Sequence, residues 1–337
     1  MTCPSGVGAQ EAGESPPSIE KINSEYQREL AKIERLRLER LGQLAASQPM
    51  DQAESTYRDY FQLAIAKGLF LEAEPVAERL LQAGDTPSQI HTLANLINIV
   101  AEADRGEYEK SLQSLVSAIS EKARQGKPGR DLGLPAASRA AIVDAYYQRL
   151  LRGYQYEVAR KAMKLVAENA EQPAIRDLAN RRTQQLELVG RDAPPIVGVD
   201  LDGQTFRLEA AKGDVVLVVF WATWCLPVAQ ELPWLQETYK KYHEQGFRII
   251  GIDVDTVQSG NMDPSSVIPA VRRFLIDYNI PWPTLLNGAG DADFARAYSV
   301  SEIPANVLIG RDGKVAHLDL VGPSLEKAVG EAISQKP

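Results

Sequence analysis

The stretch that decides the fold reads Phe220-Trp221-Ala222-Thr223-Trp224-Cys225-Leu226-Pro227-Val228-Ala229-Gln230-Glu231-Leu232-Pro233. The residues just before it, 215–219, are continuously apolar and mostly β-branched, which predicts a strand buried on both faces of a sheet. Pro227 suits the first turn of a helix, where its missing N–H costs nothing. Cys225 is therefore expected between a buried strand and the positive end of a helix dipole, where the nucleophilic thiolate is favoured.

This arrangement, Phe-Trp-Ala-Thr-Trp-Cys-x-Pro-x-x-x-Glu-x-Pro, resembles the active-site signature of the thioredoxin superfamily. Within it, the TlpA/ResA-like thiol-disulfide oxidoreductases of bacterial cell envelopes are the most similar. Their motif is Cys-x-x-Cys, and here Val228 stands where the second cysteine would be. The resemblance covers about residues 192–336 and includes the stretch Ser301-Glu302-Ile303-Pro304-Ala305.

The resemblance implies a role for several residues around the thiol. Pro304 would be a cis-proline, and Ile303 would present the backbone groups that hold a substrate chain. Trp224 would be a surface flap over the active site, beside Pro227. These four residues form the expected substrate-binding surface, and Cys225 and Glu231 form the expected catalytic pair.

Glu231 lies six residues after the cysteine on the same expected helix, within reach of the active-site region. The resemblance implies a partly buried acid that tunes the thiol and shuttles protons, although the helix dipole alone also favours a glutamate there. Val219 stands where thioredoxin has a buried aspartate, which leaves Glu231 as the only candidate acid. Ala305 replaces the threonine that usually follows the cis-proline. Apolar residues at these positions and at Val228 raise a cysteine pKa and oppose the helix terminus, so the sequence leaves this balance open.

The chain of 337 residues exceeds the usual size of one hydrophobic core and predicts two domains. Residues 1–17 are rich in Gly, Ser and Pro and are expected to be disordered. Residues 18–189 show apolar positions three or four apart with glycine stops, which predicts an all-α domain. Residues 190–195 form a stiff linker, and residues 196–337 alternate between strand-like and helix-like segments. The predicted fold is an α/β thioredoxin-like domain, with a mixed central sheet and helices on both faces, preceded by an all-α helical-hairpin array.

The helical half also carries a weak likeness to tetratricopeptide-like repeats. Aromatic residues follow Gly68, Gly106 and Gly153 at a distance of two or three positions, at the start of each new helix. Such an array offers a groove to a partner protein. A plain helical bundle that only packs on the second domain explains the same pattern, and both interpretations stay open.

The net charge of -8 argues against nucleic acid or an anionic membrane surface as the main partner. No apolar run approaches the length of a membrane span. The first residues lack a basic segment followed by an apolar core, so we expect no secretory signal in this chain. The family resemblance nevertheless points to the periplasm or cell envelope, and the sequence does not decide between that location and the cytoplasm.

The chain contains two cysteines, Cys3 and Cys225, which excludes a structural disulfide framework. A bond between them would have to close a very long loop. His91, His243 and His317 share no ligand spacing, so we expect neither a metal nor another cofactor.

Three functions compete for this sequence. In the first, which we favour, Cys225 forms mixed disulfides with a protein client or a small thiol such as glutathione, and an external thiol resolves them. In the second, the fold is a redox-inactive protein-binding module that acts with the helical domain as a scaffold. The third, a one-cysteine peroxidase, is least supported, because its Pro-x-x-x-Thr-x-x-Cys arrangement needs a hydroxyl where Ala222 stands.

Overall fold

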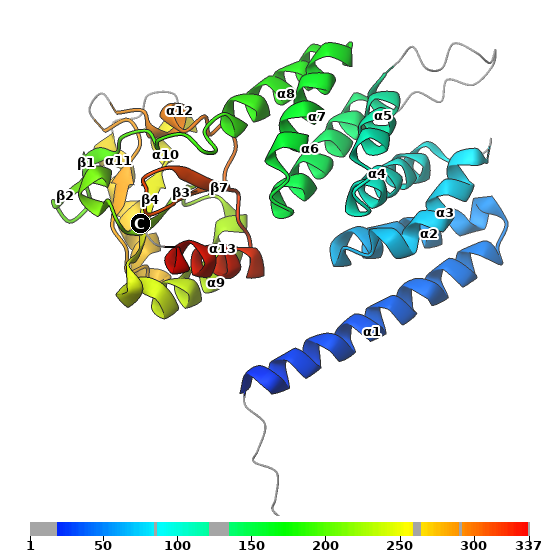
Figure 1. The fold of residues 1–337 in the computed structure, drawn as a ribbon, viewed down its shortest axis with the longest axis horizontal. Helices are drawn as coiled ribbons and strands as arrows, with labels where there is room; N and C mark the ends of the chain where they lie inside the picture. The colour runs from blue at the N-terminus through cyan, green and yellow to red at the C-terminus, as the bar shows by residue number, and fades with distance from the viewer. Residues whose placement is uncertain (1–18, 84–85, 121–134, 259–263, 290–291, 336–337) are drawn as a thin grey trace, which may run out of the picture. The chain divides into compact units, whose positions relative to one another are not determined.

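The computed structural model describes residues 19–83, 86–120, 135–258, 264–289 and 292–335 (Figure 1). The tail expected at 1–17, with Cys3, lies outside them. The chain forms two compact units, residues 1–101 and 102–337. The domain limits that the sequence suggests at 189 and 196 stay a prediction. No helix among the described residues is both long and apolar enough to cross a membrane.

The first unit is helical in its described residues. Its helices are α1 (Ile19–Ala46), α2 (Met50–Lys67), α3 (Phe70–Gln82) and α4 (Ser88–Asp104), the last of which runs past residue 101. α1 packs on α2, and a Cβ added at Gly42 would lie only 3.1 Å from the ring of Tyr60. Gly68 caps the C-terminus of α2, and its φ of 68° is the left-handed conformation expected of a glycine stop.

The second unit begins with more helices. These are α5 (Tyr108–Ile119), α6 (Ala136–Arg152), α7 (Tyr156–Asn169) and α8 (Pro173–Leu186). Tyr146 and Tyr147 of α6 are fully buried, and the Tyr146 hydroxyl shares a hydrogen bond with Ser111 of α5. At the turn after α6, Tyr154 rather than Gly153 adopts a positive φ, of 57°.

The rest of the second unit has the predicted α/β fold. A hairpin of β1 (Val197–Val199) and β2 (Thr205–Arg207) precedes a five-stranded sheet of order β5-β4-β3-β6-β7. The strands of the sheet are β3 (Val215–Trp221), β4 (Phe247–Asp253), β5 (Thr284–Leu286), β6 (Ala305–Ile309) and β7 (Val315–Leu318). The helices are α9 (Leu226–Tyr242), α10 (Asp255–Gln258), α11 (Pro264–Asp277), α12 (Phe294–Ala297) and α13 (Pro323–Ser334). Single 3₁₀ turns lie at Leu208–Ala211 and His243–Gln245.

The sheet is mixed and covered on both faces. β3 pairs in parallel with β4 and antiparallel with β6, and every residue of β3 is buried. Successive side chains of a strand point to opposite faces. Trp221 lies 4.8 Å from the ring of Phe274 in α11, whereas Phe220 lies 5.6 Å from Tyr298, just after α12. α9 and α13 pack side by side (Figure 1).

The segment expected as a linker is hydrogen-bonded to the edge strand β7 and its turn. The N–H of Gly190 donates to the carbonyl of Val315 at 2.8 Å, and the N–H of Val315 donates to the carbonyl of Arg191 at 2.9 Å. Ala193 donates to Gly313 at 3.0 Å. The chain between α8 and β1 thus runs along the sheet.

Candidate functional site

Cys225 lies at the position expected from its motif, as the residue that caps the N-terminus of α9. Its N–H donates to the carbonyl of Ala222 at 3.0 Å, and its carbonyl accepts from the N–H of Val228 at 3.1 Å. Pro227 is in the first turn. The thiol therefore occupies the electropositive end of a helix directly after a buried strand.

The thiol is more covered than a freely accessible nucleophile. Cys225 is only 5% exposed and is not in a disulfide, whereas the neighbouring Trp224 is 47% exposed. Trp224 and Ile303 line the same shallow pocket, together with Val254, Ala295, Val300, Ser301 and Glu302. The Trp224 indole, next to the cysteine in sequence, and the Ile303 loop therefore contribute to one surface.

The loop before β6 meets the cysteine loop because their strands are paired. Ala305, the first residue of β6, is opposite Phe220 of β3. The peptide bond between Ile303 and Pro304 is cis. Pro304 itself is exposed.

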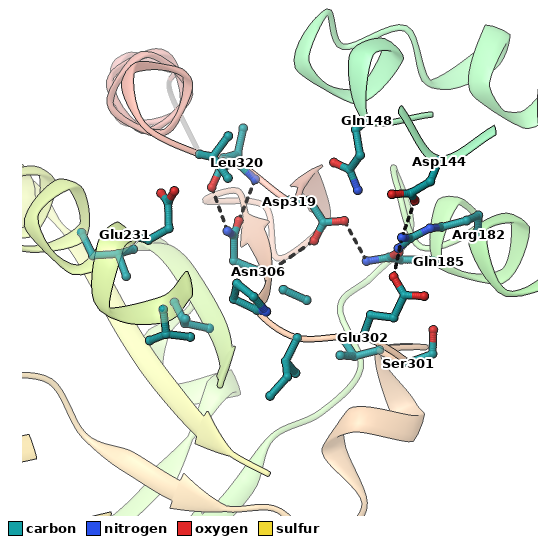
Figure 2. A pocket seen from close by; sticks show the side chains of 18 residues that line it. Asp144, Gln148, Arg182, Gln185, Glu231, Ser301, Glu302, Asn306, Asp319 and Leu320 are labelled. Atoms are coloured by element: carbon teal, nitrogen blue, oxygen red, sulfur yellow. Dashed lines mark hydrogen bonds and ion pairs between the residues drawn. The ribbon is translucent and has the colours of Figure 1, made fainter. Parts of the chain in front are cut away.

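A cavity of about 250 Å³ lies behind these loops (Figure 2). Its apolar wall includes Val219 and Val228, two of the positions where the sequence departs from thioredoxin, and it reaches Pro304. Glu231 lines the same cavity, and its carboxylate accepts a hydrogen bond from the N–H of Gly322 at 3.3 Å. Glu231 therefore lies near the position of the missing second cysteine.

Glu231 is not the only acid there, so that expectation was wrong. Asp319, just after β7, lines the cavity as well, and burial raises its pKa to about 6 although the Arg182 charge opposes the shift. Its carboxylate accepts from the N–H of Asn306 at 3.4 Å and from the amide of Gln185 at 3.5 Å. No local pattern in the sequence marks Asp319, because the contacts that bury it come from distant segments.

A second acidic pair lies on the other side of the cysteine loop. The carboxylate of Asp255 accepts the N–H of Thr223, with its two oxygens at 3.2 and 3.3 Å. Asp253 is opposite Trp221 in the sheet and is fully buried, and burial followed by the neighbouring Asp255 charge raises its pKa to about 8. Asp255 thus fixes the backbone two residues before the thiol.

Part of the polar wall of the cavity comes from helices outside the thioredoxin fold. Asp144 and Gln148 of α6 and Arg182 and Gln185 of α8 point toward it (Figure 2). No pattern in the sequence predicted that these residues line a cavity together with Val228 and Glu231. Helices α6 and α8 therefore form part of the cavity wall.

The histidines do not form a metal centre in the part of the chain that the structure covers. No group of three or more His, Cys, Asp or Glu side chains suited to a metal occurs among the described residues. His317 in β7 shares a hydrogen bond with the Tyr156 hydroxyl at 2.9 Å, and burial lowers its pKa. His317 therefore packs where α7 contacts β7.

Comparison with known proteins finds relatives of the α/β part of the chain. The AhpC/TSA family matches residues 189–318. The thiol-disulfide oxidoreductase ResA of Bacillus cereus is 32% identical over 148 residues, which is 44% of this chain and 73% of the relative. ResA of Bacillus subtilis is 34% identical over 126 residues, or 37% of this chain and 64% of the relative. The solved thioredoxin domain of a thiol-disulfide oxidoreductase from Bacteroides vulgatus is 27% identical, with a TM-score of 0.38, and covers 43% of this chain and 98% of that one.

The match to ResA of Bacillus cereus extends over most of that relative's length. Through the C-terminal part of the second unit, the chain belongs to the TlpA/ResA-like thiol-disulfide oxidoreductase family of the thioredoxin superfamily.

Proposed function

We propose that this protein exchanges disulfides through one nucleophilic thiol, that of Cys225, and acts on protein clients. The observation that carries the proposal is the pairing of Cys225 at the start of α9 with the buried Val228 three residues on. Cys225 keeps the place of the attacking thiol at the helix terminus, whereas no sulfur is present at residue 228 to resolve a mixed disulfide.

In the proposed reaction, the Cys225 thiolate attacks one sulfur of a client disulfide. The client S–S bond breaks, a bond forms between Cys225 and the client, and the second client sulfur leaves as a thiolate that takes up a proton. An external thiol of the glutathione class then attacks the Cys225 sulfur and releases the first client thiol. A second external thiol reduces that adduct, so two external thiols become one disulfide while the client disulfide becomes two thiols.

Other residues would support these steps. Glu231 would deliver the proton to the leaving thiolate from its place beside Val228. Trp224 and Pro227 would cover the thiol, and the backbone at Ile303 and Pro304 would hold the extended client.

Mass spectrometry of the trapped adduct tests the proposal. Because Cys3 is a second thiol, the protein should be compared as Cys3→Ser and as the double variant Cys3→Ser, Cys225→Ser, each incubated with a disulfide-bridged peptide. We expect one peptide adduct on the single variant and none on the double variant. Absence of an adduct on the Cys3→Ser protein would rule out the monothiol reaction.

The near-complete burial of Cys225 favours a second candidate, a redox-inactive module that binds extended polypeptides at the loop before β6. In that case the peptide binds both variants with equal affinity and reacts with neither. A partner groove on the helices and a cell-envelope location stay predictions.

A further inference from the structure

Arg182 of α8 connects the helices to the loop on which a client is proposed to lie. Its guanidinium is 2.7 Å from a carboxylate oxygen of Glu302, the residue before Ile303. The two residues are 120 positions apart in the chain. This ion pair is visible at the right of the cavity in Figure 2.

Two residues of α6, Asp144 and Tyr147, also contact the Arg182 guanidinium. It is 2.7 Å from a carboxylate oxygen of Asp144 in α6 and lies over the ring of Tyr147, 4.9 Å from its centroid. The Arg182 side chain is only 8% exposed, whereas the side chain of Glu302 is 53% exposed. A buried, doubly anchored arginine thus reaches out to a half-exposed loop residue, and the geometry of the pair is fixed from the helix side.

The loop has few other restraints. In the described part of the chain, the backbone groups of Ser301, Glu302 and Ile303 make no hydrogen bond to another residue. Asn306, inside β6, is by contrast tied to Leu320 by two hydrogen bonds of 2.8 and 2.9 Å. The ion pair to Arg182 is therefore the polar contact that fixes Ser301 to Ile303.

We propose that Arg182 is a positioning residue for client binding, by which helices outside the thioredoxin fold fix the loop before the cis-proline. The inference rests on the proposed function, since a client must lie on that loop. Arg182 acts on the affinity for polypeptides and takes no part in the thiol chemistry. The helices thereby determine how well an extended chain binds beside Cys225.

Two measurements on the full chain in the Cys3→Ser background test this role. The first compares Arg182→Met with the unchanged protein in its reaction with a disulfide-bridged peptide and with 5,5′-dithiobis(2-nitrobenzoate), a small disulfide that does not need the loop. We expect the peptide rate below saturation to fall about tenfold through a higher KM, because a hydrogen-bonded charge pair is lost. The rate of Arg182→Met with the small disulfide should stay within about twofold of that of the unchanged protein, because the Arg182–Glu302 ion pair takes no part in that step.

The second measurement is hydrogen exchange of the two hydrogen-bonded amides that flank the loop, those of Val300 and Asn306, and it does not depend on thiol reactivity. Arg182→Met should make these two amides exchange about tenfold faster while β4 and α11 keep their protection. The exposed neighbour Arg181 offers a matched control, since Arg181→Met removes the same charge from α8 without touching the loop. Glu302→Gln should reproduce the effect, and combining it with Arg182→Met should add little.

The outcomes separate the two proposals. If the unchanged protein reacts with neither disulfide, the proposed function fails, and the exchange measurement alone then decides whether Arg182 positions the loop. If Arg182→Met leaves the loop exchange and the peptide rate unchanged, the positioning role is refuted even though the thiol reacts. Faster exchange throughout the second unit would also refute it, because the variant would then only destabilise the fold.

Discussion

Replacing Val228 with cysteine would restore the family motif in a scaffold that retains the rest of the site. Val228 is 3% exposed, and its N–H bonds to the carbonyl of Cys225, so the two residues are one helical turn apart. Helix geometry places α-carbons three residues apart at about 5 Å. This lies within the range of about 4.4–6.8 Å that a disulfide spans.

The expected free-energy changes follow from this geometry. In the reduced variant, loss of part of the valine side chain from a packed site should lower the free energy of unfolding by about 1 kcal/mol. In the oxidised variant, closing a loop of four residues should raise it again by about 2 kcal/mol by the loop-entropy relation. Urea unfolding of the two redox forms measures the difference directly.

Catalysis is the main assay for this variant. With dithiothreitol as the electron donor and a protein disulfide as substrate, Val228→Cys should turn over at least about tenfold faster than the unchanged protein, because resolution becomes intramolecular. Val228→Ala is the matched control, since it trims the same side chain without adding a sulfur. Formation of a disulfide between Cys225 and the introduced cysteine without any gain in turnover would show that the site no longer supports exchange, and failure to form it would refute the geometry.

Three further predictions concern the acids and the packing around the thiol. Burial raises the pKa of Asp319 from its usual 3.8 to about 6, so between these pH values the folded protein holds a proton that the unfolded chain has released. The free energy of unfolding of the wild type should therefore fall relative to that of Asp319→Asn as pH rises from 4 to 7, by up to about 3 kcal/mol. Urea titrations at both pH values test this, and a pH-independent difference between the two proteins would contradict it. Asp255→Ala leaves the Thr223 N–H without its charged acceptor and should lower the free energy of unfolding by about 1.5–3 kcal/mol, with Asp255→Asn recovering part of the loss; equal stability of all three proteins would be inconsistent with the contact. Gly251→Ala should lower the melting temperature, because its Cβ would lie 2.7 Å from the Thr284 hydroxyl and 2.9 Å from the Trp221 indole nitrogen, an overpacking of about 1–3 kcal/mol; calorimetry showing no change would mean that the sheet relaxes freely there.

Local features of the site could be predicted from the sequence. The unbroken apolar run 215–219 predicted β3, and Pro227 predicted the start of α9, because both depend on neighbours in the chain. The cis bond before Pro304 was predicted only from the family resemblance, since composition alone does not reveal it.

The polar half of the site could not be predicted. Arg182 meets Glu302 across 120 residues, and Gln185 meets Asp319 across 134. Hydrophobic periodicity predicts which face of a helix is buried and says nothing about the segment packed against it. The raised pKa of Asp319 results from its burial by such distant segments, so the sequence could not predict it either.

The pairing of residues 189–193 with β7 also decides how the molecule can be divided. A fragment that begins at residue 196 would strip this cover and leave the outer N–H and C=O groups of β7 bare, which invites edge-to-edge aggregation. A fragment meant to report the properties of the isolated redox fold should instead keep the chain from the end of α8 onward. Any loss of solubility on shorter truncation would then reflect an uncovered strand rather than a missing partner.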